Sequence, residues 1–211
     1  ADQAKRLIHV SNLYRIAEGE RLADRLCAAS FADTVFFANS GAEAMECVIK
    51  MVRKYQSADG HPERYRIITF EGAFHGRTLA TMSASGKSGW DTMFAPQVPG
   101  FPKAELNNLS SVEALITDKT VAVMLEPVQG EGGFYIAPAE FLRALRELCD
   151  RHGIVLVFDE IQSGFARTGK MFASEHWGVQ PDIMTIAKAV TSAYVPLSAF
   201  IVSRRVHRAI L

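Results

Sequence analysis

The run Ile154–Phe158 is continuously apolar and lacks the polar alternation of a strand with one solvated face. Such a run predicts a parallel strand that is covered on both faces. Short runs of similar character predict further strands at Val35–Ala38, Arg66–Phe70, Val121–Leu125, Ile183–Ile186 and Ala199–Val202. Because helical patterns separate these runs, the expected fold class is α/β, with a mainly parallel sheet and helices on both faces.

Two helices are predicted from apolar residues that recur at helical spacing. The first helix face consists of Met45, Val48, Ile49, Val52 and Tyr55. The second consists of Phe141, Leu142, Leu145, Leu148 and Cys149, with Gly153 as the expected cap of the helix end. By contrast, the stretch Ser83–Asn108 is rich in Gly, Pro and Ser and predicts a long irregular excursion.

Composition narrows the class of protein further. Of the 211 residues, 48% are apolar and 22% are charged, which is typical of a globular chain. Lys plus Arg and Asp plus Glu both number 23, and this balance argues against nucleic acid or a membrane surface as partner. The cysteines, Cys27, Cys47 and Cys149, are odd in number and far apart, so neither a disulfide framework nor a metal cluster is expected. The reducing cytoplasm is therefore the expected compartment.

Ligands of such sheets gather outside the carboxyl ends of the strands, so the residues that follow each strand are the candidates for function. After the first strand, Ser40 is a good N-cap for the next helix, and Gly41 allows close approach of a ligand to the backbone. Free N–H groups at a helix start favour a phosphate. A plain cap without a ligand would use the same residues.

The loop after Arg66–Phe70 combines an aromatic ring, an imidazole and a guanidinium in Phe74, His75 and Arg77. Such a loop can stack on a planar ligand and hold a carboxylate through the arginine. A structural turn with a surface arginine explains the same residues equally well.

Three further candidates follow the later strands. Glu126 and Asp159 each come directly after an apolar run, where a partly buried carboxylate needs a partner. Asp159 is therefore either a counter-charge for a protonated ligand nitrogen or a helix N-cap. The apolar neighbours of Lys188 predict a buried side chain, and burial lowers the pKa of a lysine and frees its amine as a nucleophile. Most lysines, however, are only solvated charges.

These candidates together match the needs of one ligand. Pyridoxal phosphate requires a phosphate site, a side chain that stacks on its ring, an acid at the pyridine nitrogen and a lysine for its aldehyde. Each signal is weak alone, but their occurrence together at strand ends predicts this cofactor.

The same residues carry a family resemblance. The chain resembles a class III pyridoxal-phosphate-dependent aminotransferase of fold type I, whose large domain contains a mainly parallel seven-stranded sheet. The motifs that carry the resemblance are Asn-Ser-Gly-Ala-Glu-Ala (39–44), Phe-His-Gly-Arg-Thr (74–78), Glu-Pro-Val-Gln-Gly-Glu-Gly-Gly (126–133) and Phe-Asp-Glu-Ile-Gln-Ser-Gly-Phe-Ala-Arg-Thr-Gly (158–169). Lys188 stands 29 positions after Asp159, where the lysine of the family belongs.

The resemblance implies a role for each of these residues. Lys188 would form the Schiff base and move the proton, and Asp159 would keep the pyridine nitrogen protonated. Gln162 would lie near the phenolic oxygen, and Glu126 close to the cofactor. The phosphate would be bound by Ser40, Gly41 and Ala42, and the ring would be contacted by Phe74 and His75. The substrate would be contacted by Arg77 and Glu131.

The resemblance also implies an organisation. Residues 1–211 would be an incomplete large cofactor domain, with the N-terminal segment and the C-terminal small domain lying outside it. The family would use a small amine donor and a keto acid, and would form a homodimer with a shared active site. Residues up to about 130 resemble acetylornithine aminotransferases, and Gly132–Lys170 resembles 4-aminobutyrate aminotransferases. The region after Lys188 resembles omega-amine types, although Ala193 stands where those usually have Gly.

The sequence leaves two other interpretations open and gives little support to a third. Aminomutases and some decarboxylases share this fold and cofactor, and a noncatalytic fragment would retain part of the site. A nucleotide-binding module is disfavoured, because the sequence contains neither GxGxxG nor GxxxxGK[ST].

Overall fold

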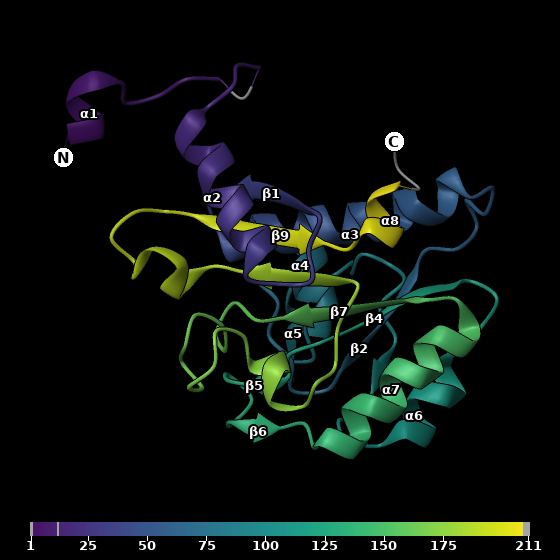
Figure 1. Cartoon of the computed structure of the whole chain (residues 1–211). Helices are drawn as coiled ribbons and strands as arrows, with labels where there is room; N and C mark the ends of the chain where they lie inside the picture. Colours follow the sequence, from purple (N-terminus) through teal and green to yellow (C-terminus); the bar gives the residue numbers. More distant parts are fainter. Residues whose placement is uncertain (1, 12, 209–211) are drawn as a thin grey trace.

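The computed structural model describes residues 2–11 and 13–208 and contains a seven-stranded sheet (Figure 1). The strand order is β1-β9-β8-β7-β4-β2-β3, and β9 runs opposite to the other six strands. The strands are β1 (Thr34–Ala38), β2 (Arg66–Phe70), β3 (Lys103–Ala104), β4 (Thr120–Leu125), β7 (Val155–Asp159), β8 (Ile183–Ile186) and β9 (Ser198–Val202). The mainly parallel α/β sheet expected from the apolar runs is confirmed.

Helices cover both faces of this sheet. One face packs against α3 (Gly41–Ala58) and α8 (Arg204–Arg208), and the other against α6 (Leu109–Leu115) and α7 (Ala139–His152). At the β1 end, α2 (Ala17–Ala28) covers the same face as α6 and α7. Alternate residues of β7 enter opposite clusters, Val155 and Val157 facing α3, and Leu156 and Phe158 facing α7. Figure 1 shows α6 and α7 side by side, with α3 across the sheet.

Both predicted helix faces are buried as expected. Met45, Val48, Ile49 and Val52 of α3 are buried, and Tyr55 packs partly buried against the same cluster. The apolar face of α7 is entirely buried, and Gly153 ends the helix at a φ of 62°. This left-handed conformation is the one in which glycine at a helix end is favoured.

The stretch Ser83–Asn108 is irregular only in part. It includes the end of α4 (Leu79–Ala84), the short α5 (Trp90–Met93) and β3, which pairs with β2 at the sheet edge. Outside the sheet, β5 (Val128–Gln129) and β6 (Tyr135–Ile136) form a small hairpin. The short α1 (Asp2–Arg6) extends away from the body of the molecule (Figure 1). Across the described ranges, the helices are all too short or too polar to span a membrane.

Candidate functional site

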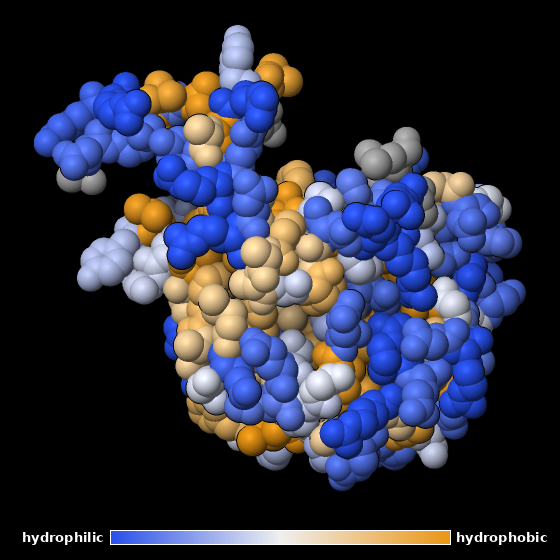
Figure 2. All heavy atoms as spheres, in the orientation of Figure 1, coloured by the Kyte–Doolittle hydropathy of each residue, from blue (hydrophilic) through white to orange (hydrophobic). Residues whose placement is uncertain are grey.

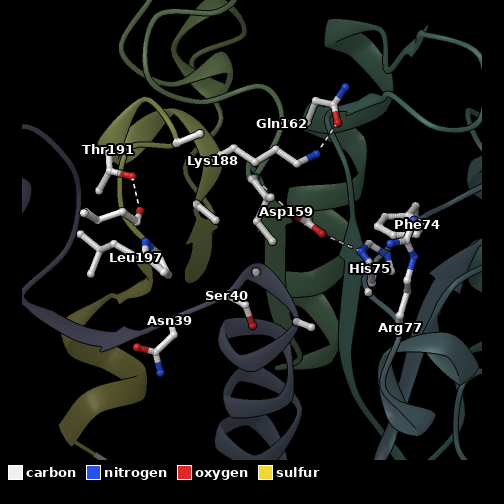
Figure 3. Close-up of a pocket in the computed structure, with 18 of the residues that line it drawn as sticks. Asn39, Ser40, Phe74, His75, Arg77, Asp159, Gln162, Lys188, Thr191 and Leu197 are labelled. Atoms are coloured by element: carbon white, nitrogen blue, oxygen red, sulfur yellow. Dashed lines mark hydrogen bonds and ion pairs between the residues drawn. The ribbon is translucent and has the colours of Figure 1, made fainter.

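A cavity of about 520 Å³ opens at the carboxyl edge of the parallel strands. Its walls come from the segments that follow β1, β2, β4, β7 and β8, so the topology collects residues that are distant in the sequence (Figure 3). Ten of the expected site residues line it: Ser40, Gly41, Ala42, Phe74, His75, Arg77, Glu126, Asp159, Gln162 and Lys188.

The start of α3 forms the floor of this cavity. Ser40 caps the helix as expected, because its Oγ accepts a hydrogen bond from the Glu43 amide at 3.3 Å. The Ser40 carbonyl accepts from Ser198 Oγ at 2.6 Å, which ties the helix start to β9. The amides of a first helical turn have no carbonyl partner within the helix, so those of Gly41 and Ala42 are suited to an anion. A Cβ on Gly41 would lie 2.8 Å from Ile161 Cδ1, so a side chain there would displace this wall of the cavity.

Asp159 and His75 form a buried pair at the centre of the site. His75 Nδ1 lies 2.8 Å from Asp159 Oδ2, and the two side chains are 0% and 3% exposed. Asp159 Oδ1 accepts from the Ile161 amide at 3.1 Å and from Thr185 Oγ1 at 3.2 Å. Asp159 is the last residue of β7 and is followed by a turn, so it is not a helix N-cap. The imidazole supplies the strong donor that a buried carboxylate needs.

The backbone and the second ring nitrogen of His75 complete this arrangement. The His75 amide donates to Ser85 Oγ at 2.8 Å. Nε2 is buried and has no hydrogen-bond partner among the described residues. A buried polar atom without a partner requires an explanation, and the residue that carries this one lines the cavity.

Lys188 is exposed, and the prediction of a buried lysine was wrong. The apolar neighbours Ile183–Ile186 form β8, which is buried, whereas Lys188 begins the 3-10 turn Lys188–Thr191 beyond the strand. Its Nζ donates to Gln162 Oε1 at 2.6 Å across the cavity (Figure 3). Gly130 makes room for that amide, because a Cβ there would lie 2.7 Å from Gln162 Nε2.

The aromatic loop forms the opposite wall. The guanidinium carbon of Arg77 lies 5.7 Å from the centroid of the Phe74 ring, within the range of a cation–π contact. The Phe74 ring meets Trp90 edge-on, with centroids 5.9 Å apart. Arg77 is exposed, so its donors are accessible to a carboxylate that enters the cavity.

Glu126 connects two walls of the cavity. Its Oε1 accepts from the Phe74 amide at 2.8 Å and its Oε2 from the Gly130 amide at 3.4 Å. Burial raises the pKa of Glu126 to about 7, and the nearby charge of Asp159 adds to the rise, against the opposing influence of His75 and these two amides. The expected partners of this carboxylate are thus backbone amides.

Glu131 is the one expected site residue that does not reach this cavity. It is exposed and lines a neighbouring cavity of about 800 Å³, together with Lys103 and residues of the 83–101 region. Phe74 lines both cavities and separates Glu131 from Lys188 and Asp159.

Several residues of the site, either in the cavity wall or bonded to a residue of that wall, were not expected from the sequence. Thr185 is paired with Asp159 in the β7–β8 register, which the sequence patterns do not reveal. The others are Asn39, Ile161, Ala187, Thr191 and the segment 194–197. The backbone of the loop that starts at Lys188 is strained: the φ angles of Lys188, Ser192 and Ala193 are 47°, 52° and 62°, in the left-handed region. Non-glycine residues in the left-handed region cluster at functional sites.

Replacing Ala193 by Gly should raise the free energy of unfolding by about 0.5–1 kcal/mol, because glycine adopts a positive φ without steric cost. The matched control is Ala189→Gly in the adjacent 3-10 turn, which should lower it by a similar amount. Urea unfolding measures both, and equal destabilisation by the two variants would contradict the strain at Ala193.

Replacing Glu126 by Gln should change how stability depends on pH. Because the pKa of Glu126 is raised in the folded chain, the folded state holds more protons than the unfolded state between about pH 4.5 and 7. The parent chain therefore loses stability across that window as pH rises, and Gln removes this loss. The variant should gain about 1–3 kcal/mol relative to the parent between pH 5 and 8 in urea unfolding. A difference that is the same at every pH would show that Glu126 does not titrate in this window.

Comparison with known proteins finds a family that matches the sequence of this chain. The sequence model of the class-III aminotransferase family matches residues 1–211. The acetylornithine aminotransferase of Mesorhizobium japonicum is 53% identical over 198 residues, covering 94% of this chain and 49% of the relative. The acetylornithine aminotransferase 2 of Bordetella pertussis is 54% identical over 206 residues, covering 98% of this chain and 52% of the relative. The chain thus spans about half the length of the curated relatives it matches.

Solved structures show the same architecture. A transaminase from the marine bacterium Virgibacillus superimposes with a TM-score of 0.94 at 32% identity, over 99% of this chain and 51% of that one. An amine transaminase from an uncultivated Pseudomonas species, in a pyridoxal-phosphate-bound form, gives a TM-score of 0.91 at 31% identity, over 99% and 53%. The chain belongs to the class-III aminotransferase family.

Proposed function

We propose that this protein transfers an amino group from an amino acid or amine donor to a keto acid such as 2-oxoglutarate or pyruvate, with pyridoxal phosphate as cofactor. One observation carries the proposal: the Lys188 amine, the Asp159 carboxylate and the first turn of α3 line a single cavity. They supply three of the four kinds of group that this cofactor requires, and Phe74 in the same cavity supplies the fourth, a ring for stacking.

The residues of the cavity fit the cofactor. The amides of Gly41 and Ala42, in the first turn of α3, would hold the phosphate, with Ser40 beside them. Asp159 accepts hydrogen bonds in the cavity wall and would hold a proton on the ring nitrogen. The aromatic ring of Phe74 would stack on the cofactor, with His75 beside it.

When bound, pyridoxal phosphate supplies a ring that accepts the electrons released as a bond to the amine-bearing carbon of the substrate breaks. Lys188 would take a proton from that carbon and deliver it to the former aldehyde carbon of the cofactor, because its amine reaches across the cavity on a flexible stem. His75 would fix the position of the Asp159 carboxylate by donating to Oδ2, and Gln162 would orient the Lys188 amine before substrate enters. The exposed guanidinium of Arg77 would hold a substrate carboxylate.

For the donor, we propose N-acetylornithine first, with 2-oxoglutarate as acceptor. The support is the name of the relatives at 53–54% identity. Comparison donors are 4-aminobutyrate, suggested by the Gly132–Lys170 motifs, and a simple amine, suggested by the loop after Lys188.

Residues 1–211 would form the cofactor domain of a homodimer in the cytoplasm. Large apolar side chains support the dimer: Ile8 and Leu13 of the N-terminal arm are 89% exposed, and Tyr194 in the cavity wall is 90% exposed. Figure 2 shows the apolar side chains of this arm in orange. Apolar groups so exposed indicate a surface that another chain covers.

Transfer should depend on Lys188 and Asp159. With N-acetylornithine, 2-oxoglutarate and added cofactor, Lys188→Ala should lower the rate of glutamate formation at least about a hundredfold, since it removes the general acid and base. Asp159→Asn should lower it about tenfold or more, because a neutral ring withdraws electrons poorly. Lys54→Ala removes an exposed lysine of α3 and should leave the rate unchanged.

The products decide between reaction types. One glutamate formed for each donor consumed, measured by chromatography, supports amino transfer. Release of carbon dioxide, or an isomerised donor without glutamate, would contradict it. Normal turnover by Lys188→Ala would overturn the assignment of the lysine.

A further inference from the structure

Lys103 is a partly buried cation that the proposed reaction does not use. It begins β3 and reaches beneath the end of α4, where its Nζ donates to the carbonyl oxygens of Ser83 at 2.6 Å and Ala84 at 2.9 Å, and to Thr69 Oγ1 at 2.8 Å. Within the described residues, no carboxylate pairs with it. Burial lowers the pKa of Lys103 to about 8. The ammonium is therefore held by neutral oxygens, and the centroid of the Phe101 ring lies 5.8 Å from Nζ.

Two of these oxygens belong to a helix end. The last carbonyls of a helix have no partner within it, and a lysine ammonium is a favourable donor to them. Lys103 thus supplies from the neighbouring strand β3 the hydrogen bonds that the sequence of α4 does not provide. This contact fixes the position of the turn that follows α4.

That turn carries the aromatic loop of the site. The Ser85 hydroxyl accepts from the His75 amide at 2.8 Å and donates to the Thr81 carbonyl at 2.8 Å. The Gly86 amide donates to the Ala73 carbonyl at 2.9 Å, and the Gly86 carbonyl accepts from the Gly72 amide at 3.0 Å. A Cβ on Gly86 would overlap the Phe70 carbonyl, so the two backbones are in close contact.

We propose that Lys103 is a positioning residue for the loop Gly72–His75: it holds the end of α4 so that Ser85 fixes His75, and His75 in turn faces Asp159. The proposal rests on the proposed function, since it concerns the ring-facing wall of the same cavity. The hydrogen bonds of Lys103 go to Thr69, Ser83 and Ala84 on the side of that wall, and none goes to the described start of α3, where the phosphate would bind.

The two ends of the cavity therefore respond differently to loss of the ammonium. Lys103→Met keeps the stem and removes the three donors. The matched control is Lys87→Met, because Lys87 lines the same neighbouring cavity but is exposed, with its Nζ 5.4 Å from the Trp90 ring centroid. Both variants lose one positive charge. A difference between them therefore reports the loss of the hydrogen bonds that Lys103 Nζ makes to the end of α4 and to Thr69.

Hydrogen exchange tests the positioning without cofactor. In Lys103→Met, the amides of residues 72–76 should exchange about tenfold faster, while those of α7 keep the parent rate. Lys87→Met should match the parent in both segments. Unchanged exchange at residues 72–76 would overturn the proposal. An equal rise in exchange in α7 would also overturn it, because that result indicates general loosening of the fold.

Ligand binding provides the second readout. Lys103→Met should raise the dissociation constant of pyridoxal phosphate several-fold and leave that of inorganic phosphate unchanged. An equal loss for both ligands would indicate a merely structural role and overturn the proposal. If the parent itself fails to bind pyridoxal phosphate, the proposed function fails, and the exchange experiment still decides the positioning role.

Ser85→Ala offers a second route if Lys103→Met folds poorly. It removes the acceptor of the His75 amide while the contacts of Lys103 remain, and it should give the same local rise in exchange at residues 72–76. In the double variant, the effects of the two changes should not add, because both act through one link. Full additivity, or a Ser85→Ala variant with parent exchange, would contradict the path from Lys103 to His75.

Discussion

The contact between His75 and Asp159 is the interaction on which the site depends. A carboxylate at the end of the buried strand β7 is costly unless strong donors surround it, and His75, Thr185 and the Ile161 amide provide them. Because His75 comes from the loop after β2, meeting this requirement draws that loop over the end of β7. Phe74 and Arg77 are placed in the cavity wall by the same loop.

Parallel topology makes this meeting possible. Five parallel strands, β1, β2, β4, β7 and β8, end at one edge of the sheet. The antiparallel β9 begins at that edge, where Ser198 Oγ donates to the Ser40 carbonyl. The groups proposed to hold the cofactor therefore stand at strand ends and a helix start, which are rigid supports. Beyond them, Lys103 supports the aromatic loop from the edge strand β3.

Sequence patterns predicted six of the seven sheet strands and the two longest described helices, α3 and α7, because apolar spacing reports burial directly; β3 lies in a stretch expected to be irregular. They predicted ten of the cavity residues through motifs and strand-end logic. Lys188 was misjudged because its apolar neighbours belong to β8, whereas the lysine itself lies in the turn beyond. Glu131 lines the neighbouring cavity because of the path of a glycine-rich loop, which has no local signature in the sequence, and its contact with substrate stays a prediction. Lys103 was missed because its partners are 19, 20 and 34 positions away.

The central claim is that the cavity receives pyridoxal phosphate with its aldehyde beside Lys188. The most direct test is to incubate the protein with pyridoxal phosphate, reduce it with borohydride and map the modified peptide by mass spectrometry. The account predicts that the label lies on Lys188 and disappears in Lys188→Ala, with Lys103 unmodified. Label distributed over exposed lysines other than Lys188, or retained at the same level in Lys188→Ala, would contradict it.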